Sequence, residues 1–141
     1  MIKTGIKTAA SLLLFGGALV AQQAQAQAQG GLREPIVRPR LSKQLADIPG
    51  KEALVLTVEF PPGGGDPVHR HDAHGFIYVL EGEIEMAVNG DKPVTLRAGD
   101  TFYEGPHDIH TVGRNASKTK RARLVVVLVK NTGVDAVLPP K

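Results

Sequence analysis

The sequence contains no cysteine and no tryptophan, and aromatic residues make up only 4% of its 141 positions. Without cysteine there can be no disulfide bond and no thiolate chemistry, so the fold depends on its apolar core alone. With so few aromatic side chains there is little surface on which a large aromatic ligand could stack. These absences exclude thiol enzymes and favour a small ligand.

A sustained helical period is also missing after the first 26 residues. Short runs rich in β-branched residues replace it, and the clearest of them cover 53–60, 76–88, 101–104 and 122–129. The segment "NGDKP" at 89–93 is typical of a hairpin turn. Many short strands separated by closely spaced turns predict an all-β barrel or sandwich, and the chain length allows a single domain.

The N-terminal segment has the composition of a secretory signal peptide. Lys3 and Lys7 precede an apolar stretch over 9–20, and an alanine and glutamine tract follows. About a dozen apolar residues fall short of the roughly 20 that cross a bilayer, so we expect removal of the segment and no stable membrane insertion. The signal peptide is predicted to cover 1–26, with cleavage after position 24 or 28 as alternatives. Export would place the protein in the periplasm if its source is a Gram-negative bacterium.

Almost no excess charge remains after that cleavage, a formal +1. Lys3 and Lys7 leave with the signal peptide, which reduces the 17 basic residues to 15 against 14 acidic ones. A surface this close to neutral gives no electrostatic reason to expect nucleic-acid binding.

The mature chain is expected to begin with an extended arm over 27–52, which is interrupted by prolines. A barrel over 53–130 and a C-terminal tail over 131–141 follow. The arm carries apolar side chains that have no helix in which to be buried. Packing of the arm against the sheet of a neighbouring copy would cover them, so we expect a homodimer. These side chains belong to Ile36, Val37 and Leu41.

Three of the five histidines lie within the stretch "HRHDAH" at 69–74. In an extended segment His69 and His71 point to the same side, where two imidazoles can share a metal ion. Histidines that only face solvent are the alternative interpretation. A third ligand has to come from another segment, and the candidate is His110, at the end of "GPHDIH".

These residues resemble the two sequence motifs of the cupin superfamily. Gly63, the "HRH" triplet and Gly82 resemble the first motif, and "GDTFYEGPHDIH" at 99–110 resembles the second. The resemblance extends from about residue 53 to residue 129. It implies a double-stranded β-helix, a jelly-roll barrel, with a metal ion in the barrel mouth. It also implies that His69, His71 and His110 are the metal ligands.

The chain departs from the cupin pattern at one ligand position. The family usually has a glutamate at the place matched by Gly75, which has no side chain. His74 would become a fourth ligand if a bulge at Gly75 turned it inward, and would face outward in a regular strand. Glu104 could replace the missing carboxylate, act as a catalytic base or lie on the rim. His107 and Asp108 fit exposed turn residues better than site residues.

The histidines predict one divalent metal ion, but they are compatible with Zn, Mn, Fe, Cu or Ni. Because three neutral imidazoles leave the charge of the ion uncompensated, we expect a small anionic oxygen compound as the ligand. An oxidoreductase of the dioxygenase type or an isomerase would use such a site. A non-catalytic cupin that binds a small ligand or a metal is the alternative, because one fold hosts many activities.

Overall fold

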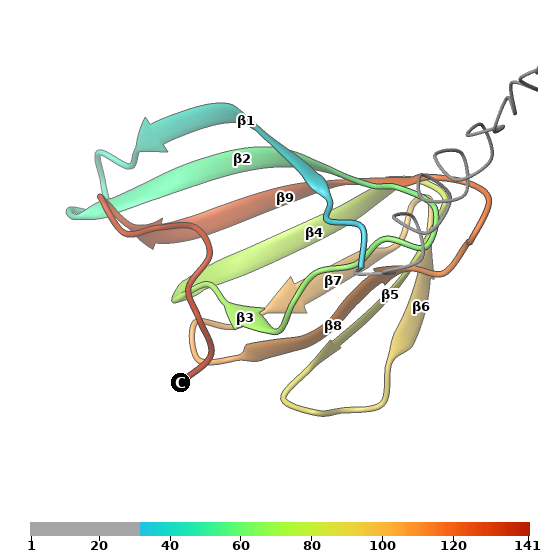
Figure 1. Ribbon diagram of the computed structural model, residues 1–141. Helices are drawn as coiled ribbons and strands as arrows, with labels where there is room; N and C mark the ends of the chain where they lie inside the picture. The colour runs from blue at the N-terminus through green and yellow to red at the C-terminus, as the bar shows by residue number, and fades with distance from the viewer. Residues whose placement is uncertain (1–31) are drawn as a thin grey trace, which may run out of the picture. The chain divides into compact units, whose positions relative to one another are not determined.

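The computed structural model describes residues 32–141, which form two antiparallel sheets facing each other (Figure 1). The predicted signal peptide at 1–26 lies outside these residues. Within residues 32–141 we find no helix with the length and apolar character needed to cross a membrane. The prediction of an all-β jelly-roll domain is confirmed.

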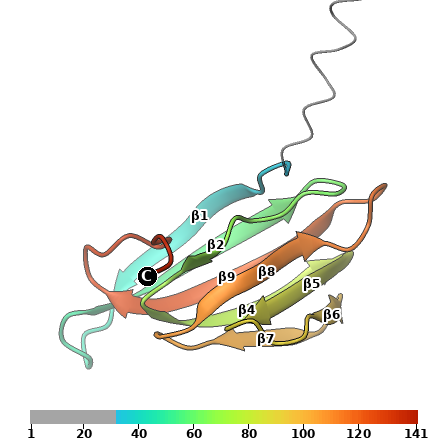
Figure 2. The same cartoon turned by 60° about the horizontal axis from the view of Figure 1, so that its bottom comes forward.

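The larger sheet has five strands in the order β1-β2-β9-β4-β7, and the smaller one has four in the order β3-β8-β5-β6 (Figures 1 and 2). The first sheet contains β1 (Ile36–Gln44), β2 (Lys51–Phe60), β9 (Ala122–Asn131), β4 (Ala73–Glu81) and β7 (Thr101–Glu104). The second contains β3 (His69–Arg70), β8 (Ile109–Asn115), β5 (Glu83–Val88) and β6 (Val94–Arg97).

Strict alternation of side chains builds the core between the sheets. In β9 every second residue is buried, from Ala122 to Lys130, and β4 alternates in the same way over Ala73–Val79. Such alternation turns one face of a strand toward the core and the other outward. The most completely buried large side chains are those of Ile84, Leu128 and Val79.

Gly82 divides the run predicted as one strand over 76–88 into β4 and β5, which belong to different sheets. Its φ of +79° lies in the left-handed region, and a Cβ there would be 2.6 Å from the backbone oxygen of Arg121. Only glycine tolerates both conditions. The chain therefore passes from one sheet to the other at a position that no other residue can fill without strain.

Residues 36–44 of the expected arm form β1, which pairs antiparallel with β2. All nine residues of β1 are exposed, including the three apolar residues named above. The strand lies at the edge of the five-stranded sheet (Figure 1). Its residue Val37 lines a cavity of the barrel.

Candidate metal centre

His69, His71 and His110 converge at the mouth of the barrel. His69 in β3 and His110 in β8 are register partners, and His71 follows β3 directly. The Nε2 atoms of His69 and His71 are 3.1 Å apart, and the potential ligand atoms of all three residues lie within 4.8 Å of one another. The two-residue spacing of His69 and His71 and the pairing of His69 with His110 thus bring the three imidazoles within reach of one ion.

Each of these imidazoles is held by a backbone carbonyl through its other nitrogen. His69 Nδ1 lies 2.8 Å from the Pro67 oxygen, His71 Nδ1 lies 2.6 Å from the Ala136 oxygen, and His110 Nε2 lies 2.7 Å from the Val112 oxygen. A neutral ring that donates to a carbonyl keeps the lone pair of its second nitrogen free. This is the arrangement by which proteins orient histidine ligands toward a metal.

The carboxylate of Glu104 faces the same point. Its Oε2 is 3.3 Å from His71 Nε2, its Oε1 is 3.4 Å from His110 Nδ1, and the residue is only 3% exposed. Glu104 in β7 is the register partner of Gly75 in β4. A Cβ built on Gly75 would lie 3.5 Å from the Cβ of Glu104. The neighbouring strand therefore provides a carboxylate beside the position where the cupin pattern usually has one.

His74 lies on the outer face of the sheet, away from the three histidines. The alternation of β4 is regular at Gly75, and its register irregularity falls instead between Val79 and Glu81. His74 Nδ1 is 2.7 Å from the hydroxyl of Tyr103, which also points outward. Of the two alternatives weighed for His74, the structure has the regular strand.

The turn between β7 and β8 contains the other two residues considered. The Asp108 carboxylate accepts a hydrogen bond of 2.7 Å from the backbone nitrogen of Gly105 and another of 2.7 Å from Asn89 Nδ2. These bonds close the turn that leads into His110. His107 is exposed in the same turn, so neither His107 nor Asp108 joins the cluster.

Burial and mutual contacts shift the pKa values of the residues in the cluster. Burial lowers the pKa of both His69 and His110. Burial also opposes the charged form of His71, but its contacts with Glu104 and with the Ala136 carbonyl outweigh that effect and raise its pKa. For Glu104, burial favours the neutral acid, yet the neighbouring histidines hold its pKa below the usual value. A carboxylate is thus retained in a buried site.

His110 Nδ1 is the one buried side-chain nitrogen or oxygen of the described residues that has no hydrogen-bond partner. Buried polar atoms without a partner are rare in folded proteins. A cation coordinated by His110 Nδ1 would satisfy this atom, and Glu104 would balance part of its charge. Three imidazole nitrogens and one carboxylate oxygen suit a divalent transition metal, so the residues present fit the metal that the resemblance implies.

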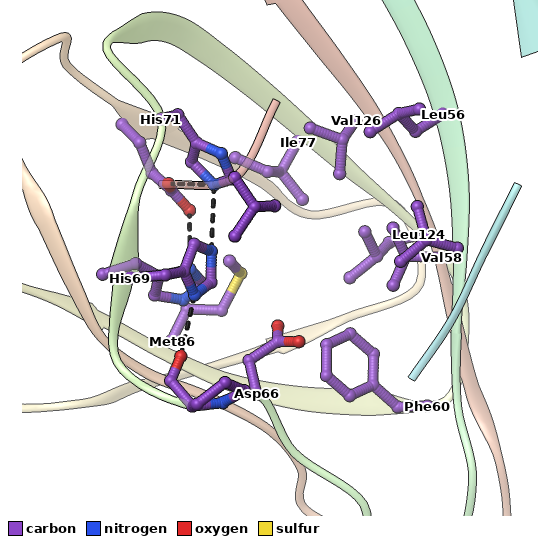
Figure 3. Close-up of a pocket in the computed structure, with 15 residues that line it drawn as sticks. Leu56, Val58, Phe60, Asp66, His69, His71, Ile77, Met86, Leu124 and Val126 are labelled. Atoms are coloured by element: carbon purple, nitrogen blue, oxygen red, sulfur yellow. Dashed lines mark hydrogen bonds and ion pairs between the residues drawn. The ribbon is translucent and has the colours of Figure 1, made fainter. Parts of the chain in front are cut away.

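The cluster forms one end of a cavity of about 110 Å³ (Figure 3). Apart from Asp66, the rest of its lining is hydrocarbon from both sheets, including Val37 of β1, from Pro67 and from the C-terminal tail. Asp66 projects its carboxyl group into this cavity, between Met86 and Phe60. Burial raises the pKa of Asp66 to about 7, opposed by His71 and assisted by Glu104 and Glu34.

Asp66 is a residue of the site that the sequence did not predict. It lies in "GGGDP", where an aspartate is ordinary for a turn. The signal that could have identified it is its place three residues before His69, on the segment that enters the site.

Comparison with known proteins agrees with this architecture. The family model described as "Cupin domain" matches residues 56–128, which is more than half of the chain. No curated protein matches the sequence. An uncharacterized conserved protein with a double-stranded β-helix domain from Klebsiella pneumoniae is 20% identical, with a TM-score of 0.61, over 82% of this chain and 94% of that chain.

Two enzymes are also among the similar solved structures. An oxalate oxidase in complex with the substrate analogue glycolate is 26% identical, with a TM-score of 0.55, over 74% of this chain and 54% of that chain. The DMSP lyase DddQ from Ruegeria pomeroyi is 20% identical, with a TM-score of 0.55, over 73% of this chain and 60% of that chain. The fold and the matched family model lead to one conclusion: the chain belongs to the cupin family.

Proposed function

We propose that this protein is a metal-dependent oxidoreductase that acts on a small oxygen anion. The observation that carries the proposal is the orientation of three imidazoles by three backbone carbonyls, with their free nitrogens and one buried carboxylate facing a common point. A cluster that only stabilised the fold would not be expected to bury the Nδ1 atom of His110 without a hydrogen-bond partner.

His69, His71, His110 and Glu104 are the residues that would hold a single divalent ion. A transition metal bound there would supply a Lewis acid and, if it is redox-active, a path for electrons to an oxidant such as dioxygen. Glu104 would cancel one of its two positive charges. The remaining single charge is the basis for an anionic oxygen ligand.

The remaining residues of the cavity have roles that do not depend on the identity of the metal. Hydrocarbon side chains surround the cavity beyond the cluster, so they limit the number of water molecules around a bound ligand. Asp66 is placed to exchange a hydrogen bond or a proton with a ligand that enters the cavity. These features suit a reaction on a small substrate from which bulk water is largely excluded.

The similarity to oxalate oxidase supports the choice of reaction class, because that enzyme is described with a small hydroxy acid bound. We extend the proposal to the place of action. The N-terminal sequence supports export, so the metal would be acquired outside the cytoplasm, in the periplasm of a Gram-negative source.

Elemental analysis of the protein purified from its own compartment tests the metal site. We expect about one transition-metal ion per chain in the wild type and in a His74→Ala control, and a loss of that metal in His71→Ala and Glu104→Gln. Full retention of metal in His71→Ala would overturn the site.

Oxygen uptake with small hydroxy acids, keto acids and diketones tests the activity of the metal-loaded protein. We expect uptake with at least one of these classes, and its loss in His71→Ala. Isomerisation without oxygen uptake would reassign the reaction class. Stoichiometric metal with neither reaction would indicate a non-catalytic binding protein.

A further inference from the structure

The cavity beside the histidine cluster is unusual in its distribution of charge. Among the described residues that line it, the charged or titratable groups are the three histidines, Glu104 and Asp66, and there is no lysine or arginine. The rest of the lining is hydrocarbon, for example Leu56, Phe60 and Val126. An anionic group on a ligand can therefore be neutralised at the cluster and nowhere else in the cavity.

A count of charges around the cluster limits the ligand to one negative charge. A divalent ion together with the Glu104 carboxylate leaves a single positive charge, which one carboxylate or enolate cancels. A second anionic group would lie against hydrocarbon or face Asp66. Burying an unpaired charge in apolar surroundings is strongly unfavourable, and two carboxylates side by side repel each other.

The size of the cavity limits the body of the ligand. The volume is about 110 Å³, whereas an engineered cavity of about 150 Å³ accommodates benzene. A chain of three or four carbons beyond the anionic group is of the right order. Such a chain would contact the hydrocarbon walls contributed by both sheets.

On the basis of the proposed metal site, we propose that the cavity selects a small monoanion with a short hydrocarbon body, and that it rejects dianions of the same length. Butyrate and succinate are suitable probes because both have four carbons. They differ at the far end, where butyrate has a methyl group and succinate has a second carboxylate. Acetate serves as the reference without a hydrocarbon chain.

Titration of the Co(II)-loaded protein at pH 7.5 measures the three affinities through the visible absorption of the bound ion. Butyrate should bind about tenfold more tightly than acetate, because each buried methylene contributes roughly a factor of four. It should also bind at least about tenfold more tightly than succinate, because only succinate brings an unpaired charge.

Two exposed valines allow a matched pair of variants. Val37 lines the cavity and is 49% exposed, whereas Val94 in β6 is 44% exposed and does not line it. Lysine is therefore compatible with folding at either position. Val37→Lys should reduce the ratio of butyrate to succinate affinity at least threefold, because the lysine gives the second carboxylate of succinate a cation. Val94→Lys should leave this ratio unchanged.

The outcomes separate this inference from the proposed function. Absence of stoichiometric Co(II) in the wild type would overturn the metal site and the inference together. Bound Co(II) with equal or tighter binding of succinate, or with acetate as tight as butyrate, would overturn the inference alone. A preference for butyrate that is unaffected by Val37→Lys would overturn the charge argument that supports it.

Discussion

Gly75 and Glu104 are neighbours across two strands, and they share one space beside the histidine cluster. The Cβ that Gly75 lacks would make ordinary van der Waals contact with Glu104, at 3.5 Å, and with Leu128, at 3.4 Å. Both positions face the interior of the barrel. A carboxylate could therefore approach the same point from either strand, provided that the other position is small.

An exchange of the two residues tests this relation. Glu104→Gly should weaken metal binding by more than tenfold, because it removes the anionic ligand from the buried site. The double variant Gly75→Glu with Glu104→Gly should recover most of that loss, because the carboxylate returns from the adjacent strand. Competition titrations with a metal-chelating dye would measure both, and a double variant as weak as the single one would contradict the shared site.

Asp66 should make the stability of the metal-free protein depend on pH. Its pKa is about 7 in the folded protein against 3.8 in an unfolded chain, so the folded state binds the proton more tightly and loses stability as pH rises from about 4 to about 7. Burial is the main cause of this shift, the charges of Glu104 and Glu34 add to it, and His71 opposes it.

The Asp66→Asn variant isolates that contribution. Asparagine cannot ionise, so in the presence of a chelator the variant should exceed the wild type at pH 8 by on the order of 2 kcal/mol. The difference should disappear near pH 4, where the aspartate is protonated in the folded state. Urea unfolding at both pH values measures it. A difference independent of pH would show that Asp66 is not the titrating group.

At the scale of elements, Gly82 determines where the chain leaves one sheet for the other. Gly82→Ala should destabilise the protein by about 3 kcal/mol, because a Cβ would meet the Arg121 oxygen at 2.6 Å in a left-handed backbone conformation. Gly90 is a matched control with a φ of +80° and open space around its Cβ position. Gly90→Ala should lose only about 1 kcal/mol. Equal losses in chemical denaturation would contradict the steric role of Gly82.

Local sequence patterns predict most of the strands, but they do not predict the complete site. Alternation over 53–60 predicts β2, the apolar run over 122–129 predicts β9, and the spacing of His69 and His71 predicts a shared face. The place of Glu104 depends on the register between β4 and β7, which long-range packing determines. Gly82 stands out in the sequence between Glu81 and Glu83, but the local pattern does not show that the two halves of the run join different sheets, because long-range pairing determines that.

At the scale of the whole molecule, a row of apolar side chains crosses the outer face of the five-stranded sheet. The row consists of direct register partners, one from each strand. Phe76 and Tyr103 are 51% and 50% exposed. Contiguous apolar surface of this kind is typical of protein interfaces. Its members are Leu41, Val55, Val127, Phe76 and Tyr103.

We predict that two copies associate through this outer row. Leu41 on β1 is then the residue of the arm that takes part in the interface. Light scattering at micromolar concentration should give the mass of a dimer. Phe76→Lys should reduce it to that of a monomer, because a charge would be buried within the row. The exposed Val94→Lys variant on β6 should remain dimeric. A monomeric wild type would contradict the prediction.

The central claim is that three histidines and the carboxylate from β7 hold one metal ion. A crystal structure of the metal-loaded protein with anomalous diffraction data tests it most directly. We predict a single strong anomalous peak about 2.0–2.2 Å from one nitrogen each of His69, His71 and His110 and from an oxygen of Glu104. A peak bound by the three histidines without Glu104, a peak at His74, or no peak at the cluster would contradict it.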